Sequence, residues 1–202
     1  TPDDEGGLTF RVSTQNPFAL RAGLSDTLGL SPERVRVLAE DVGGSFGLKG
    51  FMTREDAALA FAARHLGCEL AWLPARSETM LADVQGRAID GVLEVGLDAG
   101  HRIVAVAGRF AIDCGAYPSR RAYGLMNNVR GMTGVYDVPV AGIEIEGRLS
   151  ARVPLAPFRG NGRPEATHAI ERALDAVARQ AGIDPVALRR ANLIAPAALP
   201  VK

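Results

Sequence analysis

Hydrophobic and polar positions near the start of the chain alternate in a way that predicts short strands around a helix. Residues 8–15 place an apolar side chain at every second position, which predicts a β-strand. Residues 16–30 are predicted to form a helix with Asn16 as its N-cap, because asparagine accepts a hydrogen bond from a free N–H there and a proline follows it. Residues 34–40 alternate again and predict a second strand, and a glycine-rich run over 40–50 follows.

A second helix and a third strand are predicted after the glycine-rich run. Thr53 and Asp56 have the spacing of a capping box, and Gly67 stands where a helix commonly ends. The apolar run over 68–75 predicts another strand. Residues 8–73 are therefore expected in the order β-α-β-loop-α-β.

Strands dominate the prediction for the middle of the chain. Residues 91–97 and 102–113 alternate on either side of the short sequence DAGH, which predicts a β-hairpin. Two later apolar stretches, near 132–136 and over 141–149, are also predicted as strands.

Helical periodicity takes over in the last third. A helix is predicted to end at Gly182, and a second one to begin at Asp184 as its N-cap. The apolar face of the first helix is expected to consist of Ile170, Leu174, Val177, Ala178 and Ala181.

This mixture predicts an α+β fold in which mixed sheets pack against helices. The length of 202 residues is enough to bury a sound core in one large domain or two small ones. Two subdomains are expected, over 1–80 and 81–202.

Composition limits the function classes. The chain is 47% hydrophobic and 23% charged, which argues against disorder. Lysine plus arginine and aspartate plus glutamate number 23 each, so the formal charge is zero and no broad basic surface for nucleic acid is indicated. No apolar run approaches the roughly 20 residues that span a membrane.

Cysteine and histidine usage offers no metal site made by the protein. Two separate buried thiols at Cys68 and Cys114 are favoured over a disulfide, and two thiolates are too few for an ordinary iron–sulfur cluster. The three histidines lie far apart in the sequence without metal-ligand spacing: His65, His101 and His168.

Two stretches in the first quarter could support chemistry. Gln15, at the end of the first predicted strand, carries an amide that can both donate and accept, although a capping or surface glutamine is the simpler interpretation of this residue alone. The run EDVGGSFGLKG over 40–50 has neither P-loop nor dinucleotide-fingerprint spacing. Its backbone could instead approach a ligand closely, with Phe46 as an apolar wall; a tight structural turn is the alternative.

A third stretch, FRGNGRPEATHAIE over 158–171, combines glycines, arginines and a helix start. Backbone N–H groups at a helix N-terminus attract anions, and Arg159 and Arg163 would add positive charge. An anion site and a turn that merely carries arginines remain equally open at this point.

Together, four stretches resemble the large, molybdenum-binding subunit of the molybdenum hydroxylases. That family includes xanthine dehydrogenase, aldehyde oxidoreductases and carbon monoxide dehydrogenase. The stretches are VSTQNP (12–17), RVRVLAEDVGGSFGLK (34–49), DCGAYPS (113–119) and the segment 158–193. Their order and spacing resemble one continuous section of that subunit, so the resemblance makes residues 1–202 a first molybdopterin-binding domain segment.

The resemblance implies roles for particular residues. Gln15 is similar to a glutamine that approaches an oxygen ligand of the metal. The family's Gly-Gly-x-Phe-Gly loop lies against the molybdenum centre, which implies cofactor contacts for Gly43, Gly44, Phe46 and Gly47. The family's Phe-Arg-Gly turn lies near both cofactor and substrate, and it maps onto Phe158, Arg159 and Gly160.

The resemblance also implies cofactors and partners. The metal would be held by a molybdopterin, often its cytosine dinucleotide, rather than by protein thiolates. The [2Fe–2S] clusters and FAD are expected on partner subunits or domains, beside the rest of the molybdenum subunit. The implied reaction hydroxylates a small aldehyde or N-heterocycle with oxygen from water. A cytoplasmic location is expected, with the periplasm as the alternative.

Departures from the family pattern restrict this expectation. The family's base is a glutamate far downstream, beyond residue 202, so no catalytic residue is assigned and the chain alone is expected to be inactive. Asn127 and Asn128, with Arg130 slightly later, occupy a region where some purine-hydroxylating members carry an arginine. The carbon monoxide enzymes carry a special cysteine in the loop corresponding to 158–162, which this chain lacks. A non-catalytic scaffold, or a nucleotide-binding domain that uses the helix start at 160–165, are the alternatives.

Overall fold

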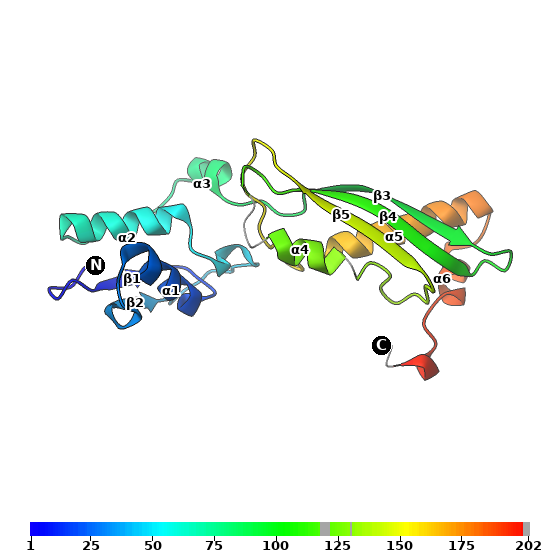
Figure 1. The fold of residues 1–202 in the computed structure, drawn as a ribbon, viewed down its shortest axis with the longest axis horizontal. Coiled ribbons are helices and arrows are strands. Elements are labelled where there is room, and N and C mark those ends of the chain that lie inside the picture. Colours follow the sequence, from blue (N-terminus) through cyan, green and yellow to red (C-terminus); the bar gives the residue numbers. More distant parts are fainter. Residues whose placement is uncertain (118–121, 130, 200–202) are drawn as a thin grey trace. The chain divides into compact units, whose positions relative to one another are not determined.

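The structure is a computed structural model that describes residues 1–117, 122–129 and 131–199 (Figure 1). The chain divides into two units, Thr1–Asp83 and Val84–Lys202, and each is described by itself.

A parallel β-α-β arrangement forms the first unit. Strand β1 (Leu8–Arg11) pairs in parallel with β2 (Val35–Leu38), and helix α1 (Pro17–Leu28) connects them. Asn16 caps α1 as predicted, because its Oδ1 accepts a hydrogen bond from the N–H of Ala19.

Helix α2 (Arg54–Leu66) begins with the predicted capping box and ends at Gly67, which has φ = 63°. The chain continues through a short helix, α3 (Arg76–Ala82), which sequence patterns did not predict. Two 3₁₀ turns, η1 (Pro32–Arg34) and η2 (Leu48–Gly50), flank β2 and the glycine-rich loop. The core of this unit consists of Leu8, Phe10, Leu20, Leu24, Val35 and Ala60.

In the second unit, a three-stranded mixed sheet lies against helices. Strand β3 (Ile89–Leu97) pairs antiparallel with β4 (Ile103–Asp113), and β4 pairs in parallel with β5 (Ala141–Arg148). The hairpin and the strand near 141–149 are therefore confirmed. Burial alternates along the central strand β4, with Val106, Phe110 and Ile112 buried, so the sheet buries one face and leaves the other to solvent.

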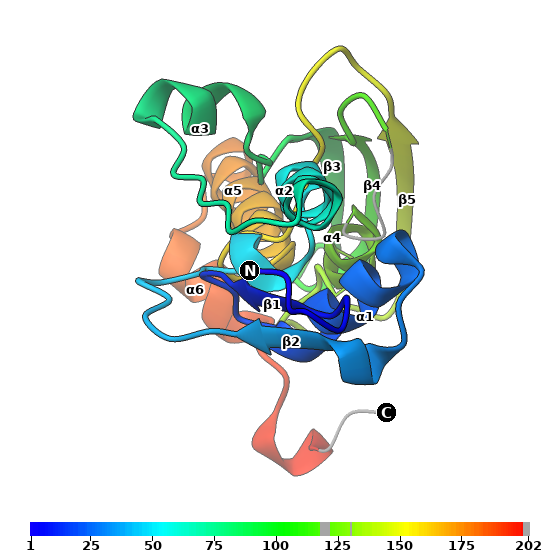
Figure 2. The ribbon, with the colours of Figure 1, turned by 90° about the vertical axis from the view of Figure 1, so that its left-hand side faces the viewer.

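Helices cover the buried face of this sheet. Helix α4 (Ala122–Val129) and the long helix α5 (Arg163–Ala181) lie on that side (Figure 2), and α6 (Pro185–Ala191) packs against α5. A last 3₁₀ turn, η3, covers Pro196–Ala198. The core gathers apolar side chains from the sheet and these helices, including Val106, Phe110, Ile112, Leu125, Val129, Ile170, Leu174 and Leu188.

The α+β fold class is confirmed, but two predicted strands are wrong. Residues 69–75 have no regular structure, and Trp72 and Leu73 in this run are exposed. The apolar residues there thus do not mark a strand, and among the described residues none pairs with them. Residues 132–135 form turns in which Gly134 has φ = 57°, and Tyr136 makes an isolated bridge to Leu193.

Three smaller expectations also need correction. The first strand ends at Arg11, so residues 12–15 are free to turn toward the loop that follows β2. Ala181, placed on the apolar face of α5 by periodicity, is exposed because it lies in the last turn of the helix. Both cysteines are free thiols, but only Cys114 is buried; Cys68 follows α2 and is exposed.

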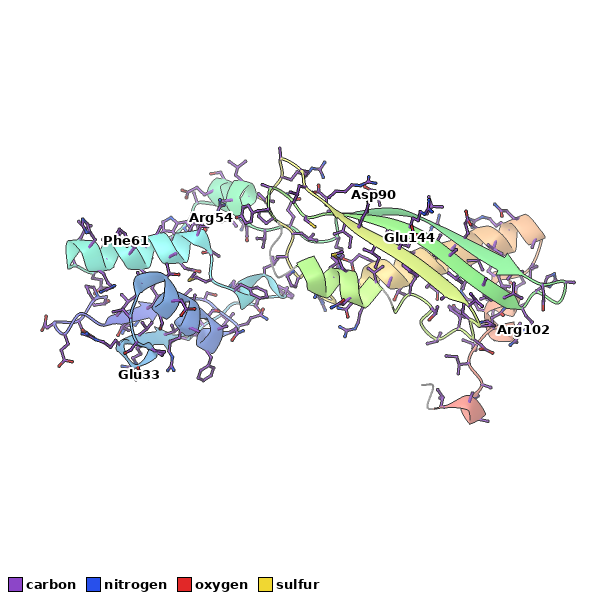
Figure 3. All side chains as sticks on the ribbon, in the orientation of Figure 1. Glu33, Arg54, Phe61, Asp90, Arg102 and Glu144 are labelled. Carbon is purple, nitrogen blue, oxygen red and sulfur yellow. The ribbon has the colours of Figure 1, made fainter. Side chains whose placement is uncertain are left out.

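Exposed apolar side chains are most frequent on α2 and the segments after it. Phe61 is 62% exposed, stacks against His65 and lies on the outer side of α2 (Figure 3). Other large apolar side chains exposed in this part of the chain are Leu66, Leu73, Met80 and Leu81. No helix among the described residues is long and apolar enough to cross a membrane.

Candidate functional site

Three hydrogen bonds join the residues that follow β1 to the glycine-rich loop, two at the end of the loop and one at its start. The buried Thr14 donates its hydroxyl proton to the carbonyl of Lys49 at 2.9 Å, and the same carbonyl accepts from the backbone N–H of Gln15 at 3.0 Å. Ser13 donates through Oγ to the carbonyl of Val42 at 2.7 Å. These contacts fix residues 13–15 against both ends of the loop.

Gln15 is oriented by the loop itself. Its Oε1 accepts a hydrogen bond from the backbone N–H of Gly47 at 3.2 Å. Because an N–H can only donate, this contact directs the amide so that Nε2 points away from that bond. Gln15 is exposed, and Nε2 donates to no partner within the part of the chain that the structure describes. The amide is thus a positioned donor.

The loop backbone uses conformations that favour glycine. Gly43, Gly44 and Gly47 have φ values of 66°, 86° and 99°. Phe46 also has a positive φ of 52°, which is uncommon for a large side chain and marks a constrained backbone. Its ring lies over Gly44, where a Cβ would come within 2.9 Å of Phe46 Cε2, and it remains 54% exposed. The loop therefore presents bare backbone beside an exposed aromatic ring.

In the second unit, the turn at 158–162 leads directly into α5. Gly160, Asn161 and Gly162 all have positive φ values, of 101°, 43° and 97°. A Cβ at Gly160 would lie 2.6 Å from Pro164 Cδ, and one at Gly162 would lie 2.6 Å from the carbonyl oxygen of Leu125. Both glycines are required by close packing as well as by φ.

Arg87 is a contact of this turn that sequence reasoning missed. Its Nη2 donates to the carbonyl of Arg159 at 2.8 Å, and its Nη1 donates to Glu165 Oε1 at 3.1 Å. The guanidinium also lies 5.0 Å from the centroid of the Phe158 ring, a cation–π distance. The only local signal for it is the dipeptide Gly86–Arg87 just before β3, which by itself is typical of an ordinary turn.

A polar depression of about 330 Å³ lies between α4 and the first turns of α5. Asn128 borders it and donates through Nδ2 to the carbonyl of Asn161 at 2.6 Å. Arg130, singled out from the sequence, lies outside the described residues. The depression is lined by Asn127, Asn128, Gly131, Arg163, Ala166 and Thr167.

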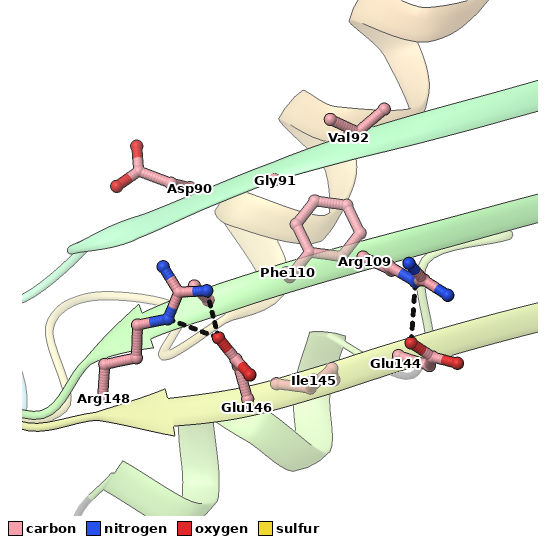
Figure 4. Close-up of a pocket in the computed structure, with 10 residues that line it drawn as sticks. Asp90, Gly91, Val92, Arg109, Phe110, Glu144, Ile145, Glu146 and Arg148 are labelled. Carbon is pink, nitrogen blue, oxygen red and sulfur yellow. Dashed lines mark hydrogen bonds and ion pairs between the residues drawn. The ribbon is translucent and has the colours of Figure 1, made fainter.

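A larger recess, of about 710 Å³, lies on the outer face of β3, β4 and β5, and its charged groups mostly pair with one another (Figure 4). Arg109 pairs with Glu144 at 2.9 Å, and Arg148 pairs with Glu146. Asp90 lies at the end of the same face (Figure 4). Paired, solvent-exposed ions on an open sheet face give no sign of a reactive site.

The DCGAYPS stretch gives no sign of a reactive thiol. Burial raises the pKa of the Cys114 thiol, and the neighbouring Asp113 carboxylate acts in the same direction. Hydrogen bonds from Ser150 and from the N–H of Gly115 lower the pKa of Asp113, which therefore stays charged beside the thiol. A thiol in such surroundings is not activated. Residues 118 and 119 of this stretch lie outside the described residues.

The predicted site residues thus form two groups. Gln15, Gly43, Gly44, Phe46 and Gly47 gather at the end of β1 in the first unit. Phe158, Arg159 and Gly160 form the turn before α5 in the second unit, with Arg87 added by the structure. Among the described residues, no group of three or more His, Cys, Asp or Glu side chains lies together as a metal site would require.

Comparison with known proteins identifies the class. Residues 1–193 match the molybdopterin cofactor-binding domain, and the chain belongs to that family. It is 32% identical to the large subunit of nicotine 6-hydroxylase from Paenarthrobacter nicotinovorans, covering 94% of this chain and 24% of that protein. It is 30% identical to the carbon monoxide dehydrogenase large chain from Afipia carboxidovorans, covering 97% and 25%.

Solved structures agree with this assignment. Quinoline 2-oxidoreductase from Pseudomonas putida 86 superimposes with a TM-score of 0.92 at 26% identity, covering 98% of this chain and 26% of that one. The Cu,Mo-CO dehydrogenase superimposes with a TM-score of 0.90 at 30% identity, covering 97% and 25%. The chain therefore spans about a quarter of the length of these relatives. It is a molybdopterin-binding domain of the molybdenum hydroxylase type of oxidoreductase.

Proposed function

We propose that this chain holds a molybdopterin cofactor, in its cytosine dinucleotide form, through two groups of residues. Gln15 and the loop residues Gly43, Gly44, Phe46 and Gly47 would contact the cofactor from the first unit. Phe158, Arg159 and Gly160 would contribute from the turn before α5. The cofactor would supply the oxygen-transfer and two-electron chemistry, and the residues named here would bind and orient it.

The observation that carries this proposal is the orientation of the Gln15 amide. Gly47 N–H occupies Oε1 and leaves the two Nε2 protons of an exposed side chain as donors. Donors of this kind suit an oxygen atom that carries negative charge, such as an oxygen ligand of a metal. The positive-φ glycines beside it let backbone N–H groups approach the same ligand. These features fit the cofactor that the family binds.

The reaction we propose is hydroxylation of a small N-heterocycle or aldehyde with oxygen from water. The names of nicotine 6-hydroxylase and quinoline 2-oxidoreductase favour the N-heterocycle. Electrons would leave through [2Fe–2S] clusters and FAD on partner subunits or domains. The base that activates the reaction would lie in another part of the molybdenum subunit, so residues 1–202 alone would give no turnover.

The test measures molybdenum and cytidine nucleotide per subunit in the full-length protein. Gln15→Glu keeps an acceptor for Gly47 N–H but replaces the amide donor by a carboxylate. A hydrogen bond to a charged group contributes about 1.5–3 kcal/mol, so cofactor affinity should fall by roughly tenfold to a hundredfold. The matched control is Gln180→Glu, an exposed position on α5, which should retain full occupancy. Equal molybdenum content in both variants would contradict the role of Gln15.

Substrate class is tested with the same preparation and an artificial electron acceptor. Nicotine, quinoline and benzaldehyde serve as probes, and carbon monoxide serves as the expected negative. Turnover of carbon monoxide alone would favour a different reaction. Protein that folds but contains no cofactor would favour a non-catalytic scaffold.

A further inference from the structure

Arg87 contacts the turn at 158–162 and the helix start behind it at the same time. One guanidinium nitrogen binds the carbonyl of Arg159 and another binds the carboxylate of Glu165, at 2.8 and 3.1 Å. The guanidinium carbon lies over the Phe158 ring, 5.0 Å from its centroid. Arg87 therefore makes three contacts through its guanidinium group, to Arg159, Glu165 and Phe158. The planar guanidinium with several N–H donors permits this, whereas the single ammonium group of lysine does not.

Glu165, whose carboxylate pairs with Arg87, lies in the first turn of α5. The Glu165 side chain is 5% exposed, and its Oε2 accepts a hydrogen bond from the backbone N–H of Gly162 at 3.0 Å. A buried carboxylate needs a compensating charge, and Arg87 provides it. Through Glu165, Arg87 is thus connected to the residue that ends the turn.

The backbone around Arg87 holds it at a fixed distance from the turn. Gln85 exchanges two hydrogen bonds with the strand-like segment before the turn: its N–H donates to Pro154, and its carbonyl accepts from Ala156. A Cβ at Gly86 would lie only 2.7 Å from Phe158 Cβ, so no other residue fits there without a shift. Arg87 itself has φ = 66°, an unusual conformation for arginine that the surrounding contacts maintain.

We infer that Arg87 is a positioning residue. It fixes the Phe158 ring and the Arg159 carbonyl in the orientation in which they face the cofactor and the substrate. This inference rests on the proposed function of the turn, and it adds a residue that neither sequence motif contains. Arg87 acts through Phe158 and Arg159 and is not itself placed against the reacting atoms.

The experiment compares Arg87→Lys with a matched control, Arg109→Lys, in the full-length protein with its molybdenum bound. Arg109 also pairs with a glutamate, but on the exposed sheet face, with side chains 84% and 73% exposed for Arg109 and Glu144. Hydrogen–deuterium exchange is followed for the turn peptide 157–166 and for the hairpin peptide 89–113. The Mo(V) electron paramagnetic resonance spectrum is recorded after partial reduction at equal molybdenum content.

The expected result is local. Arg87→Lys should exchange at least about fivefold faster over 157–166, with 89–113 unchanged, and its Mo(V) spectrum should differ from that of the wild type. Arg109→Lys should match the wild type in all three measurements. The inference would be overturned by unchanged exchange in the turn, or by a loss of protection that spreads equally over the hairpin. It would also be overturned if the turn exchanged faster while the Mo(V) spectrum stayed unchanged.

A double variant covers the case in which the single one does not fold. Arg87→Met with Glu165→Gln removes both charges, so no unpaired buried carboxylate remains to destabilise the unit. It should fold and show the same faster exchange in 157–166; a turn as protected as in the wild type would contradict the role of Arg87. A wild-type protein without molybdenum would count against the proposed function, whereas the exchange comparison would still decide whether Arg87 fixes the turn.

Discussion

Lys49 Nζ donates a hydrogen bond to Ser13 Oγ at 2.7 Å and a second one to the carbonyl of Val42. The ammonium group thereby joins the residues after β1 to the start of the glycine-rich loop. Because Gln15 is oriented by the same loop through Gly47, we regard Lys49 as the cation that keeps this region in one conformation.

Lys49→Met should loosen the loop without unfolding the unit. Losing hydrogen bonds to a charged donor, each about 1.5–3 kcal/mol, predicts that amide exchange over residues 43–47 rises by about tenfold or more. The matched control is Arg36→Met, which removes one exposed positive charge from β2 in the same unit. Exchange over 43–47 that is equal in the two variants would argue against Lys49 as the fixing residue.

Gly115 and Gly182 allow a comparison of two glycines with similar backbone conformations. Their φ values are 73° and 67°, but a Cβ at Gly115 would lie 2.3 Å from the carbonyl oxygen of Val153, whereas one at Gly182 meets nothing within 4 Å. Gly182→Ala should lower the free energy of unfolding by about 1–2 kcal/mol, the cost of left-handed backbone for alanine. Gly115→Ala should cost roughly 3 kcal/mol or more, because backbone must move as well. Urea unfolding monitored by circular dichroism measures both, and equal losses would contradict the steric argument.

The sequence was sufficient where local chemistry decides the structure. The caps at Asn16, Thr53 and Asp184 and the stops at Gly67 and Gly182 appear as predicted, since each depends on a few neighbouring residues. The strand predicted over 68–75 was wrong because a strand needs a partner, and apolar residues such as Leu73 look the same in the sequence whether they are exposed or paired.

In the candidate site, too, the sequence alone could not predict contacts that depend on tertiary packing. Gln15 and the glycine-rich loop could be singled out by residue type and composition, and because their stretches resemble a known family. Arg87 could not, because its contacts with Arg159 and Glu165 bridge more than seventy residues. Its environment is created by tertiary packing of the segment at 85–87 against the one at 154–158.

Asn192 makes a buried connection between the β3–β4 turn and α6. The residue is 1% exposed; its Oδ1 accepts from the N–H of Ile103 at 2.7 Å, and its Nδ2 donates to the carbonyls of His101 and Leu188 at 2.9 Å each. Asn192→Leu would leave the Ile103 N–H and two carbonyls without this partner. At about 1–3 kcal/mol for each unsatisfied buried group, the free energy of unfolding should fall by about 3 kcal/mol or more.

The control for this prediction is Asn127→Leu, an asparagine at the edge of the polar depression rather than in the core. It should change the free energy of unfolding by less than about 1 kcal/mol. Denaturant midpoints at constant slope provide the comparison, and similar losses at both positions would show that the buried hydrogen bonds of Asn192 contribute little.

Tyr136 gives the second unit a dependence on alkaline pH. Its hydroxyl donates to Glu171 Oε1 at 2.7 Å, and Arg189 of α6 binds the other carboxylate oxygen of Glu171 at 2.7 Å. Burial, followed by the hydrogen bond to the Glu171 carboxylate, raises the pKa of Tyr136 from its ordinary value of 10 to about 12. The folded protein therefore favours the protonated phenol more than the unfolded chain does.

The sign of the effect follows from proton binding. Between pH 10 and about 12 the folded state keeps the Tyr136 proton while the unfolded chain loses it, so unfolding releases a proton and the free energy of unfolding falls as pH rises. The stabilising contribution is complete below pH 10 and is lost on passing through about pH 12.

Tyr136→Phe should remove this component, so that the difference in stability between wild type and variant shrinks steadily above pH 10. Glu171→Gln should retain the part that burial causes and lose the part that the carboxylate causes, and its tyrosine titration should move toward lower pH. Urea unfolding at a series of alkaline pH values, with ultraviolet difference spectra of tyrosinate, measures both. A wild-type-minus-Phe difference that stays constant from pH 7 to 12 would contradict a raised pKa for Tyr136 in the folded protein.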